Sequence, residues 1–375
     1  LAKDYAFESR KKIVASKDGW SPAVWSTIAE MGLTGLPFSP DYGGFGGGAV
    51  DLMAVMEAMG DALLVEPYLA TVGLGAQFVA RAGSEAQKKA ILPAVVEGRL
   101  KMAFAHTEKG ARYNLAKVEA QARSSTGGAG AGWEITGDKY VVLGAPAADT
   151  FVVSAKTDKG LSLFLVKKES AKVKAYVTLD EQRAGDVSFS KAPGELLGTE
   201  GGALPVIEEV MDFATALICA EAVGAMKFAC DTTLEYLKTR TQFGRPIGQN
   251  QGVQHRATEM FMSLEQGRSM AMLAAMMVDE PDAAERARNL AMVKAGVGQA
   301  ARFQIGLGRG DRRCLSHGRR GVSHCHSESD QHRRACREDR CRAGPEYNSR
   351  RMRAAAPSPP PRCRPRRIRN RSRAA

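Results

Sequence analysis

Arg240-Thr241-Gln242-Phe243-Gly244-Arg245-Pro246-Ile247-Gly248-Gln249-Asn250-Gln251 joins two long segments that have the hydrophobic periodicity of helices. The stretch predicts a corner between helices, because Gly244 is suited to ending one helix and Pro246 to the start of the next. An ordinary helical hairpin needs no more than this. Few hairpins need an arginine, Gln-Phe-Gly, Pro-Ile and a further glutamine in this order, so the corner is also a candidate ligand site.

The sequence on both sides of this corner, from residue 201 to about 306, is predicted to be helical. Apolar residues recur at three- and four-residue intervals over 206–239, 252–278 and 283–303. The first segment is rich in alanine and contains Gly224 and Met226, which favours close packing between helices. Helices of this length predict a helical bundle.

The two regions before the bundle differ from each other in the spacing of their hydrophobic residues. Residues 1–99 carry helical stretches at 25–33, 50–64 and 69–82, and another begins at 83–87. Residues 100–200 contain short β-rich runs separated by turn residues, which predict a small antiparallel barrel or sandwich. These runs are 102–106, 117–123, 133–135, 140–143, 150–155, 161–166, 175–179 and 187–190. We therefore expect an α+β multidomain protein, with a helical domain (1–99), a β-domain (100–200) and a C-terminal helical bundle (201–306).

The segment 307–375 differs in composition from the rest of the chain. It has 20 arginines, no lysine and 6 acidic residues, whereas the preceding part has 33 basic and 35 acidic residues. The net charge of +12 therefore comes from this segment. Because it has few large aliphatic residues, it cannot bury a core and is predicted to be a disordered, arginine-rich tail. Lysine disappears as arginine, cysteine and proline rise together, which suggests that the segment is read out of frame.

Two functions of the tail are alternatives to an out-of-frame segment. Zinc would need ligands from Cys325, His326, His332, Cys336 and Cys341, but their spacings match no paired C-x₂-C arrangement. We therefore predict no metal site. The arginines would bind nucleic acid electrostatically, but only Tyr347 is available for base stacking, so nucleic acid is not an expected partner.

The cellular setting follows from the rest of the chain. Cys219 and Cys230 lie in predicted helices with no evident pairing, which favours a reducing compartment. No run approaches the roughly 18 apolar residues of a membrane span, and no signal peptide is evident at the start. We therefore expect a cytoplasmic location and no membrane partner.

The 240–251 corner resembles the flavin-binding corner of the acyl-CoA dehydrogenase family. Further segments resemble that family in the same order, namely Met31-Gly32-Leu33 with Tyr42-Gly43-Gly44, then Gly83-Ser84-Glu85, Phe104-Ala105-His106-Thr107-Glu108 and Leu196-Leu197-Gly198. The resemblance implies the family's order of domains, with FAD as the cofactor. Glu66-Pro67-Tyr68, Arg112-Tyr113-Asn114 and Cys219-Ala220-Glu221 are closest in style to the small-subunit type associated with pimeloyl-CoA.

The resemblance implies FAD contacts at the corner. Arg240 would contact the pyrophosphate of a neighbouring subunit's FAD, because a guanidinium offers two parallel donors that match it. Gln242, Phe243 and Gln251 would frame the adenosine and the pyrophosphate.

The resemblance also implies FAD contacts in the β-domain. Thr107 would lie near the flavin ring, in a loop that follows Phe104 and His106. The alternative for Thr107 and Glu108 is a strand end with a solvated glutamate. The alternative for His106 is a β-domain side chain without a chemical role.

The reaction implied by the resemblance is α,β-dehydrogenation of an acyl-CoA thioester, as in fatty-acid and other lipid metabolism. A carboxylate would remove the proton next to the thioester carbonyl while a hydride leaves for the flavin. Pimeloyl-CoA or another dicarboxylyl-CoA is the predicted substrate, and an electron-transfer flavoprotein the predicted electron acceptor. The alternative is a non-catalytic, flavin-binding or structural subunit of a heteromeric acyl-CoA dehydrogenase. The chain is expected to form a homo-oligomer, or a hetero-oligomer with a large dehydrogenase subunit.

Several positions depart from the family pattern. The flavin loop continues Lys109-Gly110-Ala111-Arg112-Tyr113-Asn114 where the family has Pro-Gly-Ala-Gly-Ser-Asp, so substrate recognition there must differ. Arg112 is either a partner for a carboxylate or a CoA phosphate, or a solvated side chain. Val141-Val142-Leu143 replaces the family's Trp-Ile-Thr, which removes a hydroxyl near the flavin.

The catalytic base is not assigned by the sequence. The resemblance implies a glutamate base, which most members place in the C-terminal helical part, beyond residue 306 here, and a minority place early in the long helix, where this chain has Ala214. The neighbouring substrate-binding arginine position reads Thr215. Glu208, Glu209 and Glu221 lie nearby, but none matches the pattern. The family's Gln-Leu-His-Gly-Gly flavin contact has only a faint counterpart at 315–318, inside the predicted tail.

Overall fold

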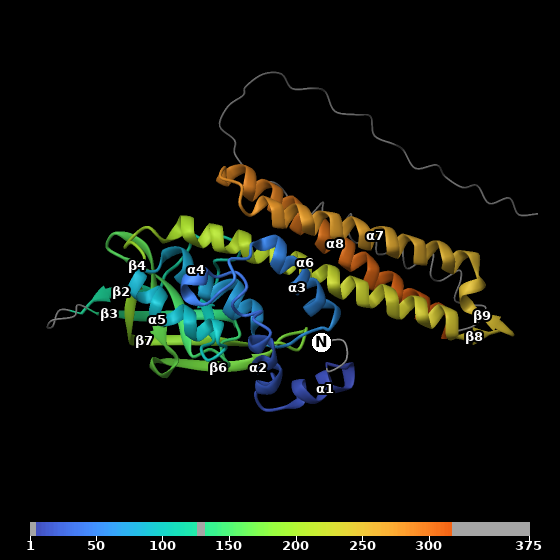
Figure 1. The fold of residues 1–375 in the computed structure, drawn as a ribbon, viewed down its shortest axis with the longest axis horizontal. Coiled ribbons are helices and arrows are strands. Elements are labelled where there is room, and N and C mark those ends of the chain that lie inside the picture. Colours follow the sequence, from blue (N-terminus) through green and yellow to red (C-terminus); the bar gives the residue numbers. More distant parts are fainter. Residues whose placement is uncertain (1–4, 126–131, 317–375) are drawn as a thin grey trace, which may run out of the picture. The chain divides into compact units, whose positions relative to one another are not determined.

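The N-terminal part of the protein is helical in a computed structural model that describes residues 5–125 and 132–316 (Figure 1). Its helices are α1 (Phe7–Ala15), α2 (Pro22–Glu30), η1 (Pro40–Tyr42), α3 (Ala49–Asp61), η2 (Leu69–Gly75), α4 (Ala76–Ala82) and α5 (Glu85–Val96). Local signals set their starts. The Ser21 hydroxyl accepts the N–H of Val24 at the start of α2, and Ser84 and Gln87 form a capping box at the start of α5.

The stretch predicted as one helix over 69–82 consists of two elements. Its first half, η2, is a π-helix, a rare wide turn that is frequently found at functional sites. Glycines make room for it. A Cβ on Gly75 would lie 2.5 Å from the Cβ of Met102, and one on Gly73 would lie 3.0 Å from Leu217. The wide turn therefore packs directly between the first strand and the bundle.

The β-domain is a closed barrel of mixed pairing. Its strands are β1 (Met102–Ala105), β2 (Gln121–Ser124), β3 (Trp133–Leu143), β4 (Thr150–Thr157), β5 (Gly160–Lys167), β6 (Ala171–Val177) and β7 (Arg183–Leu197). The ring runs β4-β2-β3-β7-β5 and closes from β5 to β4, with β1 added at β4 and β6 at β7. The barrel is as predicted. Strictly antiparallel pairing was wrong, because β4 pairs in parallel with β1 and, at one position, with β2. Strand β4 and its parallel partners are not consecutive in the chain. The segments between them are therefore long enough for the crossover that parallel strands require.

The turn predicted between the runs at 133–135 and 140–143, at Gly137-Asp138, is instead a bulge. The two runs at 133–135 and 140–143 form the single strand β3, whose register with β7 shifts between Ile135 and Gly137. A Cβ on Gly137 would lie 2.5 Å from that of Ala120. The glycine therefore reflects a close backbone approach rather than a chain reversal.

Three long helices form the C-terminal bundle, α6 (Ala203–Thr239), α7 (Gln251–Met277) and α8 (Ala283–Ser316). Helix α3 packs very closely against α6. A Cβ on Gly224 would lie 1.9 Å from the backbone oxygen of Glu57, and one on Gly60 would lie 1.9 Å from that of Glu221. The close packing predicted from the small residues of this helix is confirmed.

Helix α8 extends further than the sequence indicated. It continues to Ser316, so the first ten residues of the predicted tail, 307–316, are helical rather than disordered. The rest of the segment predicted to be out of frame, 317–375, lies outside the described residues, so this prediction is not tested by the structure.

Helix α6 is long and apolar enough to cross a membrane by length and composition, contrary to the expectation that no run comes close. This is weak evidence for a span, because the core helix of a bundle passes the same test. In the apolar window 56% is buried inside the protein.

Candidate functional site

The corner between α6 and α7 is a small β-hairpin, found at the right-hand end of α6 in Figure 1. Strand β8 (Thr241–Gln242) pairs with β9 (Arg245–Pro246). Phe243 and Gly244 between them have φ of 53° and 78°, which is the left-handed geometry of a tight two-residue hairpin turn. Helix α6 ends at Thr239, as its predicted range did, but Gly244 turns the hairpin and does not end the helix, so that predicted role of Gly244 was wrong.

The hairpin presents its functional side chains to solvent. Phe243 is 87% exposed, and Arg240 and Gln251 are also exposed. Within the described residues the guanidinium of Arg240 has no hydrogen bond or ion pair. Gln242 is half-buried, and its amide donates to the backbone oxygen of Thr241 at 2.9 Å. The tight turn therefore exposes to solvent the guanidinium of Arg240, which has no partner in the described residues, and the ring of Phe243.

A groove of about 330 Å³ lies beside the hairpin. Aliphatic side chains, two amides and one ammonium line it, from Leu234, Leu237, Lys238, Pro246, Gly248, Gln249, Gln254 and Ala257. Mostly apolar walls with a few polar groups are typical of sites for small ligands. The groove is large enough for part of a nucleotide cofactor.

A buried polar network lies at the end of β1 in the barrel. The Nζ of Lys139 donates to Glu108 Oε1 at 2.7 Å, to Ser154 Oγ at 3.1 Å and to the backbone oxygen of His106 at 3.2 Å. The Nδ1 of His106 lies 2.9 Å from Ser154 Oγ. Because a lysine ammonium can only donate, the Ser154 hydroxyl accepts from Lys139 and gives its own proton to His106.

The charges of this network follow from its burial. Desolvation lowers the pKa of His106 to about 4, with help from Lys139, so the imidazole is neutral at neutral pH. Desolvation also lowers the pKa of Lys139 to about 8, against the opposing effect of Glu108. Burial alone would raise the pKa of Glu108, but hydrogen bonds from Lys139, Ala120 and Glu119 outweigh it and lower that pKa. The solvated-glutamate alternative was therefore wrong.

The three predicted flavin-loop residues differ in access. Phe104 and His106 are 9% and 8% exposed, and their rings stack with centroids 5.1 Å apart. Thr107 is exposed, and its backbone oxygen accepts the N–H of Tyr140 at 2.8 Å. Thr107 therefore has a surface for a ligand, whereas Phe104 and His106 lie beneath it. Flavin contact by these residues stays a prediction.

Backbone strain also marks the predicted site segments. Three of the six non-glycine residues with positive φ in the described ranges are Arg112, Val141 and Phe243, at 50°, 53° and 53°. They lie in the flavin loop, in the segment replacing Trp-Ile-Thr, and in the corner. Strained backbone of this kind clusters at ligand-binding sites.

The barrel network and the corner hairpin lie far apart in one chain (Figure 1). The π-helix η2 packs against both β1 and α6, and it contacts α6 at Leu217. From Leu217 to Arg240 a helix rises roughly 35 Å. The point where the wide turn beside β1 contacts α6 therefore lies far along this helix from the corner.

The candidate carboxylates of α6 have distinct environments. Glu209 pairs with Arg81 at 3.1 Å, and Glu208 is exposed. Glu221 is largely buried, and desolvation together with the charge of Asp180 raises its pKa to about 7. At the family's early base position, Ala214 is buried and supplies no acid.

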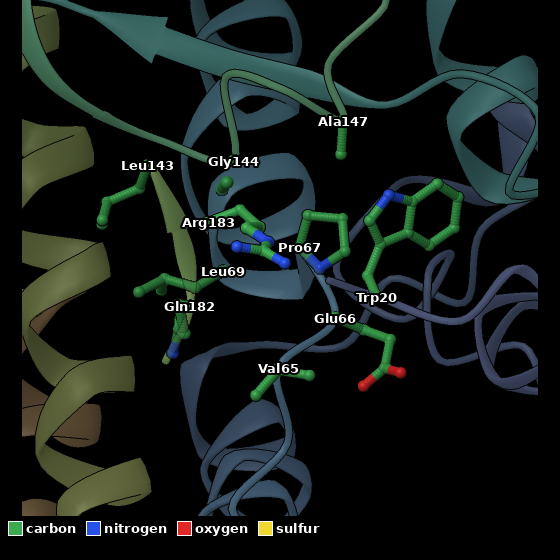
Figure 2. Close-up of a pocket in the computed structure, with 11 residues that line it drawn as sticks. Trp20, Val65, Glu66, Pro67, Leu69, Leu143, Gly144, Ala147, Gln182 and Arg183 are labelled. Atoms are coloured by element: carbon green, nitrogen blue, oxygen red, sulfur yellow. The ribbon is translucent and has the colours of Figure 1, made fainter. Parts of the chain in front are cut away.

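A second cavity lies between the N-terminal segment and the barrel (Figure 2). Its volume of about 20 Å³ suits roughly one water molecule, so it is too small for a cofactor or thioester. Both carboxylate oxygens of Glu66, in its wall, are buried, and burial raises the pKa of this group against the opposing effect of the nearby Tyr5 hydroxyl. In Figure 2 this carboxylate points away from the guanidinium of Arg183.

Comparisons with known proteins agree with this arrangement. Three sequence models match in order, those for the acyl-CoA dehydrogenase N-terminal domain (residues 4–99), middle domain (103–191) and C-terminal domain (201–307). The L-prolyl-[peptidyl-carrier protein] dehydrogenase of Pseudomonas fluorescens is 30% identical over 294 residues, which is 74% of this chain and 76% of that protein. The chain belongs to the acyl-CoA dehydrogenase family.

Two further relatives link the family to its cofactor and substrate class. The acyl-CoA dehydrogenase FadE12 of Mycobacterium tuberculosis is 29% identical over 299 residues, covering 75% of this chain and 76% of that protein. The FAD complex of PigA superposes with a TM-score of 0.72 at 29% identity, over 80% of this chain and 81% of that one. Members of the family are FAD-dependent oxidoreductases, and FAD is the cofactor of this chain. The unpaired Arg240 and exposed Phe243 beside a groove fit the phosphate and aromatic parts of that cofactor.

Sequence reasoning missed Lys139 and Ser154. Lys139 lies on β3 in a segment of alternating polarity, where a lysine is usually solvated. The available signal was that the charged Lys139, two residues before Val141, occupies a position whose side chain should face the barrel interior. Its partner, Glu108, lies on a loop 31 residues away, so the pairing depends on barrel closure.

Proposed function

We propose that this protein carries out FAD-dependent α,β-dehydrogenation of an acyl-CoA thioester as part of an oligomer. The observation that carries the proposal is the corner hairpin, where Arg240 and Phe243 are exposed beside a groove and the Arg240 guanidinium has no partner among the described residues. Arg240 supplies paired donors for a pyrophosphate, and Gln242 and Gln251 supply amides around it. When bound, FAD accepts the hydride that leaves the substrate.

The distance between the two parts of the proposed site supports an oligomer. The wide turn η2, which packs beside β1, contacts α6 at Leu217, and Arg240 lies roughly 35 Å further along that helix. A cofactor whose ring lies near Thr107 would therefore be held at its pyrophosphate by the Arg240 of another subunit. We propose that this subunit is a second copy or a larger dehydrogenase subunit.

The finer parts of the proposal rest on the resemblance. Pimeloyl-CoA or another dicarboxylyl-CoA is the proposed substrate, and an electron-transfer flavoprotein the proposed acceptor. A role in fatty-acid metabolism and a cytoplasmic location stay predictions.

A non-catalytic subunit is the second candidate, and the substitution at position 214 favours it. Ala214 cannot remove a proton, and the neighbouring Thr215 hydroxyl donates to the backbone oxygen of Met211 at 2.7 Å. A catalytic chain needs another base. Glu221 is the candidate on this helix, because a base works best when its pKa is near the working pH.

Flavin content and anaerobic reduction separate these candidates. The full chain, purified with FAD, is expected to retain flavin, and Arg240→Ala to lose it while the control Arg288→Ala on α8 does not. Bleaching of the flavin by a dicarboxylyl-CoA indicates a catalytic subunit, and Glu221→Gln should then abolish it. Flavin retention without bleaching indicates the non-catalytic subunit. Equal flavin retention by both arginine variants would contradict the role of the corner.

A further inference from the structure

The loop that follows Thr107 is closed by a buried clamp. Glu108 accepts the N–H groups of Glu119 at 2.5 Å and Ala120 at 3.0 Å, while Lys139 neutralises its charge. The carboxylate therefore joins the two ends of the loop 108–119. A compact loop whose ends meet in this way is an Ω-loop, and such loops are frequently functional.

The interior of the loop is also ordered. Ala111 is buried, and its N–H donates to the backbone oxygen of Glu108 at 3.1 Å. The side chain of Asn114 accepts the N–H of Ala116 at 3.0 Å, and the ammonium of Lys117 donates to the oxygen of Gly110 at 3.3 Å. The loop therefore presents its remaining side chains from a preorganised frame.

The outer surface of the loop combines positive charge with one aromatic ring. Lys109, Arg112 and Lys117 are exposed, and Tyr113 is 95% exposed. Arg112 has a left-handed backbone with φ of 50°, and its guanidinium has no partner in the described residues. A strained, unpaired arginine beside a free aromatic ring suits a planar ligand that carries phosphate.

We propose that the loop 108–119 binds the 3′-phosphorylated adenine nucleotide of coenzyme A, with Arg112 on the 3′-phosphate and Tyr113 stacked on the adenine. Lys109 and Lys117 supply further positive charge around the phosphates. The assignment rests on the proposed function, because it requires a CoA thioester as substrate. It places recognition in the residues that replace the family's usual loop sequence.

A nucleotide fits this surface better than a carrier protein. A stable protein partner covers about 800 Å² on each side and usually centres on a cluster of buried aromatic and arginine anchors. The exposed part of the loop offers one aromatic residue and three cations within nine positions, from Lys109 to Lys117. This is the size and chemistry of a single nucleotide.

The test compares CoA with dephospho-CoA, which lacks only the 3′-phosphate, by calorimetry on the full chain. Arg112→Asn is the main variant, because asparagine tolerates a positive φ and loses the charge. We expect it to weaken CoA binding on the order of tenfold, as for loss of a charge-assisted hydrogen bond, and to leave dephospho-CoA binding unchanged. Tyr113→Ala should weaken both ligands and Tyr113→Phe neither. Arg288→Asn is the matched control.

Each result has a defined consequence. Equal loss of CoA and dephospho-CoA affinity in Arg112→Asn would overturn the phosphate contact. Loss of binding to an acidic acyl-carrier protein, with CoA binding unchanged, would assign the loop to a protein partner instead. Acyl-pantetheine, which has no nucleotide, tests the proposed function separately. If neither it nor acyl-CoA bleaches the flavin of the wild type, dehydrogenation fails while the CoA comparison still decides the nucleotide site.

Discussion

Replacement of Glu221 by glutamine is expected to stabilise the protein at alkaline pH and to have little effect in acid. Desolvation and the charge of Asp180 raise the pKa of Glu221 from 4.5 to about 7. Below about pH 4.5 the group is neutral in both the folded and the unfolded chain. As the pH rises to 7, the unfolded chain loses this proton first, so the folded state is progressively disfavoured.

The expected magnitude follows from the difference in pKa. Each pKa unit corresponds to 1.36 kcal/mol, so a difference of about 2.5 units disfavours folding by roughly 3 kcal/mol above pH 7. Glutamine has nearly the same shape and no charge. Glu221→Gln should therefore raise the free energy of unfolding by up to about 3 kcal/mol at pH 8, and the gain should vanish near pH 4.

Urea unfolding of the full chain between pH 4 and 8 measures this difference. The control is Glu208→Gln, an exposed glutamate on the same helix. Asp180→Asn should lower the folded-state pKa of Glu221, so the destabilisation should still begin near pH 4.5 but should be smaller and level off at a lower pH. Parallel curves for wild type and Glu221→Gln at all pH values would refute the buried, titrating carboxylate.

Three further outcomes are expected. Lys139→Met should destabilise the protein by about 3–5 kcal/mol in urea unfolding, because it leaves the buried Glu108 charge unpaired, and adding Glu108→Gln should recover part of the loss. Gly224→Ala should lower the melting temperature, because its Cβ would lie 1.9 Å from the backbone of α3. The control Gly298→Ala on α8 has open space around it and should not lower the melting temperature. Equal shifts in the two variants would contradict the close packing of α3 on α6. His106 should stay neutral by NMR down to about pH 5, because burial lowers its pKa to about 4, and stability should fall as the pH drops from 6.5 towards that value; a His106 pKa near 6.5 would disprove its burial.

Local residue patterns predicted much of the fold and part of the candidate site. The helix starts at Ser21 and Ser84 depend on hydrogen bonds within a few residues, so they can be read directly from the sequence. The order of side chains at 240–251 is equally local, and it indicated the family. The barrel was predictable from short alternating runs, but the parallel partner of β1 was not, because strand pairing depends on distant segments.

The functional site depended more on tertiary structure. Glu108 and Lys139 look like ordinary surface charges in sequence, and only barrel closure buries them together at 2.7 Å. The raised pKa of Glu221 likewise requires α6 to pack beneath other elements. No local pattern reports such burial, because the dielectric surroundings of a charge come from residues elsewhere in the chain.

The sequence by itself determined the family, the cofactor and the order of helical and β-rich regions, because these follow from short motifs and from periodicity. The tertiary structure decided where the parts of the site lie. It placed Arg240 roughly 35 Å along α6 from Leu217, where the wide turn beside β1 contacts that helix. It also closed the 108–119 loop around one buried carboxylate. Distances and burial of this kind arise only when remote segments pack, and packing is what converts a list of suitable residues into a site.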